Sequence, residues 1–366
     1  MFGSSSKFSK AFFGMLPPPK FLEMPAVGLH IGNSAIRFID LERKNAGFIP
    51  SRFAERKIPE GVMEAGYIKK PEELKKILIS LKSEFGLRFV NASLPEERAY
   101  LFKTQTPKVS HAEIREILEF RLEENVPLSG GEAVFDFNVL PFLPNSSHLD
   151  ISVTVLPSDF VASYTELLNQ SGLTPLSFQV EAQAVSRAVI TKDDPRTFLL
   201  ANIGESRSSL AIVRGDVVYF SSTVSAGGRN IREVLRKHYG VSEGEAENLK
   251  KEIGFAGNKK YEAVYSGLSG AISSLKDEIN KIINYWRTHQ AKISPVSKND
   301  IAGIILCGHD SGLDGFLEYI ESETKTKTEV GNVWKNTFSL EDYVPPISFL
   351  DSLDYAAAIG LALPKE

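Results

Sequence analysis

One short pattern occurs twice in this chain, near the start of each half. Residues 30–34 read His-Ile-Gly-Asn-Ser, and residues 202–206 read Asn-Ile-Gly-Glu-Ser. Each copy lies between two short apolar runs, which is typical of the turn in a β-hairpin. If the two turns face each other across a cleft, their backbone N–H groups and Ser hydroxyls can bind phosphate oxygens from both sides. Glycine suits this role because it lets the backbone approach a phosphate closely.

Length and composition narrow the class of protein. The chain has 366 residues, more than one core usually organises, so we expect two or more domains. Its net charge of -4 argues against nucleic-acid binding. Cys307 is the sole cysteine, which excludes an internal disulfide and fits a reducing cytoplasm. No stretch approaches the roughly 18 to 20 apolar residues that span a bilayer, and no signal peptide is recognisable. We expect a cytoplasmic protein.

Residues 1–24 have the composition of a separate arm, rich in Phe and Lys. In a helix, Phe8, Phe12, Met15 and Leu16 would share one face, and the prolines that begin at Pro17 would end that helix. Two interpretations stay open. The arm is either an amphipathic contact for an anionic membrane surface or a partner, or a disordered tail.

The first half of the chain predicts a mixture of strands and helices. A hairpin over 27–41 is followed by a helix from Pro71 to the stop at Gly86, then a buried strand at 89–94. The block 100–172 predicts a strand at 100–105, a helix capped by Ser110 and Glu113, strands at 135–140 and 151–156, and a helix at 159–171. This block could be a small inserted domain.

The second half begins with strands at 198–203, 208–213 and 217–223, and then becomes mostly helical. Gly228 leads into one helix, and Ser242 with Glu245 caps a second that Gly254 closes. Apolar residues spaced by three or four from 264 to 286 predict one long helix with a core-facing stripe. A buried strand at 301–306 precedes a turn flanked by Gly308 and Gly312.

A series of short strings follows in order along the chain. They are Val-Gly-Leu-His-Ile-Gly at 27–32, Ala-Ser-Leu-Pro at 92–95, Glu-Phe-Arg-Leu-Glu-Glu-Asn-Val-Pro at 119–127, Glu-Ala-Gln-Ala at 181–184, Gly-Gly at 227–228, Glu-Ala-Glu-Asn-Leu-Lys at 245–250, Ile-Leu-Cys-Gly at 305–308, and Tyr-Ala-Ala-Ala-Ile-Gly-Leu-Ala at 355–362. With the two turns, this order resembles the actin, Hsp70 and hexokinase superfamily. Within that superfamily it resembles the PilM family of type IV pilus assembly proteins, which are relatives of the division protein FtsA.

The resemblance implies an α/β fold: an actin-like (ribonuclease H-like) two-lobed duplicated fold with a small inserted α+β domain. It implies a first lobe at 25–99 and 173–195, an inserted domain at 100–172, and a second lobe at 196–350 with a helical subdomain at about 228–298. Residues 351–366 would form a C-terminal helix that returns to the first lobe.

The resemblance also implies a nucleotide site. One turn would meet the terminal phosphates from the first lobe and the other from the second, the later Gly-flanked turn would lie beside adenosine, and Glu247 and Lys250 would contact the nucleoside. Glu181 matches the position that orients the attacking water. The alternatives are a solvated Glu247 and Lys250 pair and a surface carboxylate at Glu181. The implied set is Gly32, Asn33, Ser34, Gly204, Glu205, Ser206, Gly228, Glu247, Lys250, Gly308 and Gly312.

The chain departs from hydrolysing relatives at the two positions before Ile-Gly. Those relatives carry Asp there, which holds Mg²⁺ and orients the nucleophile, whereas this chain has His30 and Asn202. Imidazole and a neutral amide are poor ligands for magnesium. We therefore expect weak or no Mg²⁺ binding, no metal site and no catalytic residue beyond a residual role for Glu181, while ATP binding stays open. Glu205 and Asp310 are the carboxylates near the turns that could compensate.

By family, the expected function is a cytoplasmic scaffold at the inner face of the plasma membrane. Its partners would be the cytoplasmic peptide of a PilN-like bitopic protein, which lies between the first lobe and the inserted domain in that family, and other pilus assembly proteins. Three alternatives remain. They are an active ATP-hydrolysing switch, an FtsA-like division tether, for which the sequence lacks a C-terminal amphipathic helix, and a sugar kinase, for which no catalytic Asp is matched.

Overall fold

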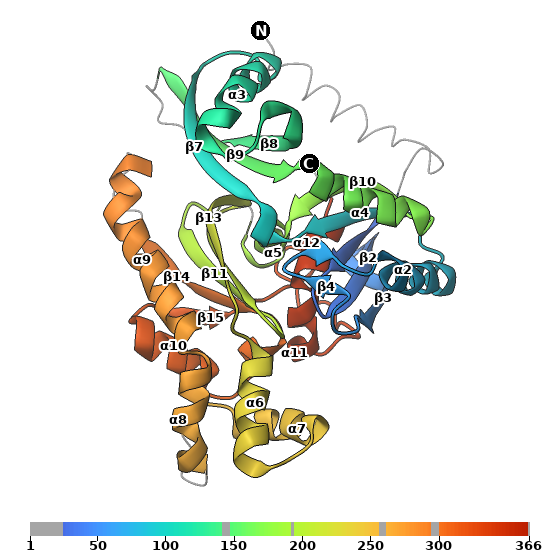
Figure 1. The fold of residues 1–366 in the computed structure, drawn as a ribbon, viewed down its shortest axis with the longest axis vertical. Helices are drawn as coiled ribbons and strands as arrows, with labels where there is room; N and C mark the ends of the chain where they lie inside the picture. Colours follow the sequence, from blue (N-terminus) through green and yellow to red (C-terminus); the bar gives the residue numbers. More distant parts are fainter. Residues whose placement is uncertain (1–24, 141–146, 192–193, 256–260, 294–299, 365–366) are drawn as a thin grey trace.

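The computed structural model describes residues 25–140, 147–191, 194–255, 261–293 and 300–364. The predicted arm at 1–24 lies outside these ranges. Two five-stranded mixed sheets form the body of the molecule, a smaller three-stranded sheet lies at one end, and helices extend from the other end (Figure 1). None of the helices that the structure describes is long and apolar enough to cross a membrane.

The first sheet is built around the predicted hairpin. β1 pairs antiparallel with β2 and parallel with β6, and the hairpin turn falls at Gly32 to Ser34 as predicted. The strand order is β10-β6-β1-β2-β3. The bounds are β1 (Ala26–Ile31), β2 (Ala35–Lys44), β3 (Gly47–Lys57), β6 (Phe89–Leu94) and β10 (Thr174–Val180), with α2 (Pro71–Phe85) and the small pair β4 (Met63–Glu64) and β5 (Tyr67–Ile68) between them.

The second sheet repeats this plan. Its order is β13-β12-β11-β14-β15, so an antiparallel meander of three strands is again extended by two parallel strands. β11 corresponds to β1 and carries the second turn at its end. The duplicated topology, with helices on the sheet faces, is the expected actin-like α/β architecture. The bounds are β11 (Thr197–Ile203), β12 (Ser208–Arg214), β13 (Val217–Val224), β14 (Ile301–Cys307) and β15 (Thr328–Val330).

The three-stranded sheet has the order β7-β9-β8 and a hydrophobic core of its own with α3, which includes Ile114, Leu118 and Val153. The predicted capping box of Ser110 and Glu113 opens α3. The next helix, α4, was expected to belong to this block, but Phe160 and Tyr164 bury its apolar face in the core of the first sheet. The bounds are β7 (Tyr100–Pro107), α3 (His111–Asn125), β8 (Ala133–Val139), β9 (His148–Pro157) and α4 (Ser158–Gln170), with short 3₁₀-helices η2 (Glu96–Arg98) and η3 (Gly130–Glu132).

Among the helices of the second half, α9 and α10 contact the second sheet, while α6, α7 and α8 pack against one another at the end of the molecule (Figure 1). The single helix predicted over 264–286 is wrong: the structure has α8 and α9, which are separated at Ile272. The break follows Gly267 and Gly270, two poor helix formers, and the Ser273 hydroxyl donates to the Gly270 carbonyl there. The bounds are α6 (Gly228–Tyr239), α7 (Glu243–Ile253), α8 (Glu262–Ala271), α9 (Ser273–Ile293), η5 (His309–Gly312) and α10 (Phe316–Thr324).

The space between the two sheets is filled by α5 (Glu181–Val189) and α12 (Ala356–Ala362), preceded by α11 (Phe349–Ser352) and η6 (Leu353–Tyr355). Glycines let these backbones touch. A Cβ on Gly28 of β1 would lie 1.9 Å from the Ala358 carbonyl oxygen, and one on Gly360 would lie 1.7 Å from that of Ala184. α12 therefore joins the first strand of the first sheet to α5, on backbone contacts that a side chain would prevent.

Candidate functional site

The turn between β1 and β2 is closed by its own backbone. The Gly32 N–H donates to the Ala35 carbonyl at 3.0 Å, and the Ser34 carbonyl accepts from Ile58 at 2.8 Å. The Asn33 side-chain oxygen accepts from the Gly66 N–H at 3.4 Å. The Gly32 N–H, a donor that a phosphate could have contacted, therefore already has a partner within the turn.

His30 is a buried, neutral group. Its Nδ1 lies 2.9 Å from the Ser93 hydroxyl, and the residue is 7% exposed. Burial, with the nearby positive charge of Arg37, lowers the pKa of His30 to about 3. The imidazole is thus uncharged at neutral pH. At this position, the family resemblance implies a carboxylate in relatives that bind magnesium.

The turn between β11 and β12 is closed in the same way, because the Gly204 N–H donates to the Arg207 carbonyl at 3.1 Å. Asn202 directs its amide to Glu181 at the start of α5, with 2.6 Å between Nδ2 and Oε1. Burial raises the pKa of Glu181, although the bond from Asn202 opposes the shift. The structure brings these two predicted residues together, and it rules out the alternative of a surface carboxylate. Among the described residues, no hydrogen bond or ion pair joins His30 to Asn202.

Glu247 and Lys250 lie on one face of α7, as their spacing predicts, with 3.0 Å between the Lys250 Nζ and the Glu247 Oε2. Lys250 is not a solvated residue: its side chain is 2% exposed and its Nζ lies 2.5 Å from the Asp310 Oδ1. Burial lowers the pKa of Lys250, but the two carboxylates outweigh it and the net shift is upward. The pKa of Asp310 is raised, because burial together with the nearby Glu205 and Glu247 carboxylates outweighs Lys250.

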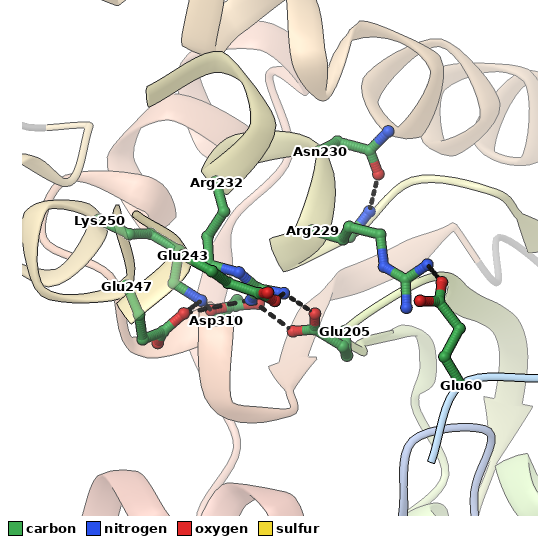
Figure 2. A network of polar contacts seen from close by, with 10 residues as sticks. Glu60, Glu205, Arg229, Asn230, Arg232, Glu243, Glu247, Lys250 and Asp310 are labelled. Atoms are coloured by element: carbon green, nitrogen blue, oxygen red, sulfur yellow. Dashed lines mark hydrogen bonds and ion pairs between the residues drawn. The ribbon is translucent and has the colours of Figure 1, made fainter. Parts of the chain in front are cut away.

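Arg232 of α6 lies at the centre of the same cluster (Figure 2). Its guanidinium donates to both carboxylate oxygens of Glu205, the middle residue of the second turn, and to Glu247 at 3.1 Å. Glu243 lies 3.7 Å away. Burial alone would raise the pKa of Glu205, but Arg232 lowers it below the usual range. We call Glu205, Arg232, Glu247, Lys250 and Asp310 the ion-pair network.

The glycines of the predicted site are sites of close packing. A Cβ on Gly228 would lie 1.8 Å from the Asp310 Oδ2, so this carboxylate rests on the first residue of α6. Gly308 has a φ of 83°, and a Cβ added to it would lie 2.2 Å from the Ile203 carbonyl oxygen. Only glycine fits this position. Gly312 packs against the Leu350 side chain, 2.3 Å from an added Cβ.

The N-terminus of α6 also has internal partners. The N–H groups of Gly228 and Arg229 donate to the carbonyls of Gly204 and Glu205, at 3.2 and 2.8 Å. Such N–H groups commonly bind phosphate at the start of a helix. Here they hold the second turn instead.

Two ion pairs join the lobes beside the second turn. Arg229 of α6 lies 2.8 Å from Glu60, which precedes β4 in the first half of the chain (Figure 2). Arg207, at the end of the turn, is paired with Glu97 of η2. Sequence reasoning missed all of the arginines in this region, because their partners lie on other elements. The only available signal was the position of Arg232 one turn after Gly228 in a helix that was already predicted.

The carboxylates that could have compensated for the lost Asp residues are engaged. Glu205 is bound by Arg232 and Asp310 by Lys250. In the part of the chain that the structure describes, no three His, Cys, Asp or Glu side chains come together as a metal site. The side chain of His309, next to Asp310, lies outside what is described.

Comparison with known proteins identifies the family. The model of the family described as type IV pilus assembly protein PilM matches residues 28–366. The chain belongs to this family. Its fold is also similar to that of solved structures. A PilM–PilN type IV pilus biogenesis complex aligns with a TM-score of 0.73 and 22% identity, over 93% of this chain and 98% of that chain.

Two further structures share the fold at lower similarity. The ethanolamine utilization protein EutJ from Carboxydothermus hydrogenoformans has a TM-score of 0.55 and 14% identity, covering 93% of this chain and 90% of that chain. MreB5 of Spiroplasma citri bound to ADP has a TM-score of 0.54 and 14% identity, covering 90% and 94%. Together with the duplicated sheets, these likenesses establish the actin-like α/β fold.

Proposed function

We propose that this chain is a scaffold of a type IV pilus assembly complex, which binds the cytoplasmic segment of a PilN-like membrane protein and does not hydrolyse ATP. The observation that carries the proposal is the family match over 28–366, supported by the fold shared with the PilM–PilN complex. A scaffold acts by shape and contact, so it can tolerate the loss of catalytic carboxylates.

The unit of β7, β8, β9 and α3 supports a peptide-binding role. β8 is an outer strand of its sheet, and the backbone groups of an outer strand can pair with an added strand. Val134 and Val139 on β8 are 45% and 44% exposed, and Phe120 on α3 is 86% exposed. Arg115, Val134 and Phe135 line a groove between α3 and β8. Apolar side chains beside an open edge suit an extended segment with alternating apolar residues.

The binding test uses the full chain and a labelled peptide with the sequence of the PilN-like protein's cytoplasmic segment. Fluorescence anisotropy should give saturable binding, which Val134→Asp weakens by about tenfold or more because it places a charge at the apolar edge. The matched control is Val344→Asp, since Val344 lies 84% exposed on the second half of the chain. Absence of peptide binding would remove the basis of the scaffold proposal.

The residues at the predicted nucleotide site do not fit Mg²⁺-ATP as they stand. His30 is neutral and bonded to Ser93, and Asn202 is bonded to Glu181. Lys250 and Arg232, the two cations of the ion-pair network, are committed to carboxylates of the chain. Glu205, Glu247 and Asp310 already neutralise Arg232 and Lys250, so the ion-pair network offers a triphosphate no free positive charge. We therefore infer that this cleft lacks ATPase activity.

A single-turnover assay with radiolabelled ATP and Mg²⁺ tests the second part of the proposal. We expect phosphate release at the rate of a buffer blank. The variants His30→Ala and Asn202→Ala distinguish hydrolysis by this protein from hydrolysis by a contaminating enzyme. Hydrolysis that either substitution removes would contradict the proposal, whereas hydrolysis that neither affects would come from another enzyme.

The proposed location at the membrane depends on the partner protein. A bitopic PilN-like protein would bring this chain to the inner face of the plasma membrane, and other pilus assembly proteins would join it there. Residues 1–24 would add a second contact with the anionic surface. Flotation with anionic vesicles, for the full chain and for a chain that begins at residue 25, tests this contact without the partner.

A further inference from the structure

The cluster of charged side chains at the second turn is unusually complete. It joins four separate elements: the β11–β12 turn through Glu205, α6 through Arg232, α7 through Glu247 and Lys250, and η5 through Asp310. Each cation has at least two carboxylate partners within ion-pair distance. Figure 2 shows these side chains converging on one point from α6, α7 and the loops below them.

Burial makes the cluster costly to break. The side chains of Lys250 and Asp310 are 2% and 5% exposed, and that of Arg232 is 10% exposed. Removing one member of a buried pair leaves an uncompensated charge in a poorly solvated place. The cluster therefore has one strongly preferred arrangement, in which α6 and α7 are held against the second turn and η5.

Backbone contacts enforce the same arrangement. The amides at the N-terminus of α6 donate to the second turn, and the Asp310 carboxylate rests against Gly228, where no side chain could fit. The groups at the site that the family resemblance assigns to a nucleotide are thus already bonded to one another. The Arg229–Glu60 and Arg207–Glu97 pairs extend this hold to the first lobe.

We propose that the ion-pair network takes the place of a nucleotide as the element that fixes α6 and α7 against the second turn and η5. In a nucleotide-dependent switch, the ligand contacts both the turns and the helices and thereby links them. Here, side chains of the chain make that link. The inference rests on the proposed absence of ATP hydrolysis, but it goes further because it concerns what holds α6 and α7 in place.

The consequence for ligand response follows from linkage. A ligand shifts a conformational equilibrium only by its difference in affinity for the two states. Because the ion-pair network already fixes α6 and α7, Mg²⁺-ATP has no looser arrangement of these helices to shift. The amide exchange of α6 and α7 in the full chain should therefore be unchanged by millimolar Mg²⁺-ATP.

The test is hydrogen exchange by mass spectrometry on the full chain and on two variants. Arg232→Met removes the central cation and keeps an apolar stem, and we expect exchange in α6 and α7 to rise by about tenfold or more while β1, β2 and β6 keep their protection. The matched control is Lys75→Met, which removes the exposed Lys75–Glu72 pair on α2 and should change neither region.

Two results would overturn the proposal. One is slower amide exchange of α6 and α7 when Mg²⁺-ATP is added to the unchanged chain. That result would mean that a nucleotide still helps to hold these helices in place. The other is normal exchange of these helices in Arg232→Met. Should Arg232→Met fail to fold, Glu247→Gln, which keeps both cations and the Asp310 partner, gives the same comparison in milder form. Neither readout depends on hydrolysis, so failure here is distinguishable from failure of the proposed function.

Discussion

The side chain of Asn202 donates a hydrogen bond of 2.6 Å to Glu181, a partly buried carboxylate on a different element. The residue that replaces the Asp of hydrolysing relatives is thus bonded to the residue that the family resemblance assigns to orienting water. The amide gives this carboxylate a hydrogen-bond donor, which lowers the cost of its burial.

Substituting Asn202→Asp should destabilise the protein. Two carboxylates would face each other at hydrogen-bond distance in a partly buried place, which costs about 2 kcal/mol at pH 8. The cost should shrink as the pH falls, because one carboxylate then takes up a proton. Urea unfolding at pH 5 and pH 8 measures it. The double variant Asn202→Asp/Glu181→Gln exchanges the two groups and should recover much of the stability; equal stability of the single variant and the parent at pH 8 would contradict the account.

Glu96 should make stability fall as the pH rises. It is 4% exposed, and burial raises its pKa from 4.5 to about 7, although the Ala182 N–H donates to it. The contribution is fully present below pH 4.5 and is lost as the pH rises through 7, by about 3 kcal/mol in all. Glu96→Gln keeps an oxygen acceptor for Ala182 and should gain stability over the parent between pH 5 and 8. The exposed Glu42→Gln should follow the parent at each pH; parallel profiles for Glu96→Gln and the parent would be evidence against this role.

His30 should have the opposite effect at lower pH. Its pKa is lowered from 6.5 to about 3 by burial and by Arg37, so the folded state resists protonation. Its contribution is present above pH 6.5 and is lost as the pH falls toward 3, by about 3 kcal/mol between pH 6.5 and 4. His30→Asn should therefore lose less stability than the parent over that interval, as measured by urea unfolding. Because Glu96 and His30 act in opposite directions between pH 4.5 and 6.5, the difference between variant and parent is the informative quantity.

Gly228→Ala should destabilise the protein by about 1 to 3 kcal/mol, because the added methyl group would overlap the Asp310 carboxylate and displace it from Lys250. Gly270→Ala is the matched control. Gly270 also lies in a helix, but a Cβ there meets nothing within 4 Å, so the substitution should be neutral or slightly stabilising. Similar unfolding midpoints for the two variants would show that the Asp310 contact carries no constraint.

Cys307 should be inert in the folded protein. It lies in β14 at 0% exposure, and burial raises the pKa of its thiol to about 12. A thiol with that pKa forms roughly a thousandfold less thiolate at neutral pH than one of pKa 9, and the reagent must also reach it. Reaction with an aromatic disulfide reagent should be negligible in buffer and complete in urea. Rapid reaction in buffer would place this strand at the surface.

Features that depend on neighbouring residues were predictable from the sequence. The two hairpin turns, the capping boxes at Ser110 and Ser242, and the helix stop at Gly86 each involve residues within a few positions of one another. Local sequence determines such contacts, because turn and cap geometries need particular residue types at fixed spacing. The repeat of Ile-Gly-x-Ser extended this local signal to the whole fold, since the same hairpin recurs in both sheets.

The features that were missed depend on distant residues. Arg232 gains its role from Glu205 and Glu247 on two other elements, and its position one turn after Gly228 does not identify these partners. Glu181 was assigned mainly by resemblance, and only the structure brings it to Asn202. The break between α8 and α9 could not be predicted, because the apolar residues keep a spacing of three or four across it. That spacing indicates which residues are buried and does not show whether the helix is continuous.

The packing of α12 has a consequence for synthesis on the ribosome. The helix α12 (Ala356–Ala362) covers β1, which is the first strand in the described part of the chain. The two backbones touch at Gly28. This part of the first sheet cannot be covered until the ribosome has translated residues 356–362, which follow the whole of the second sheet in the sequence. The first sheet therefore completes its core only after the second sheet has been translated, and the nascent chain carries an uncovered apolar face until then.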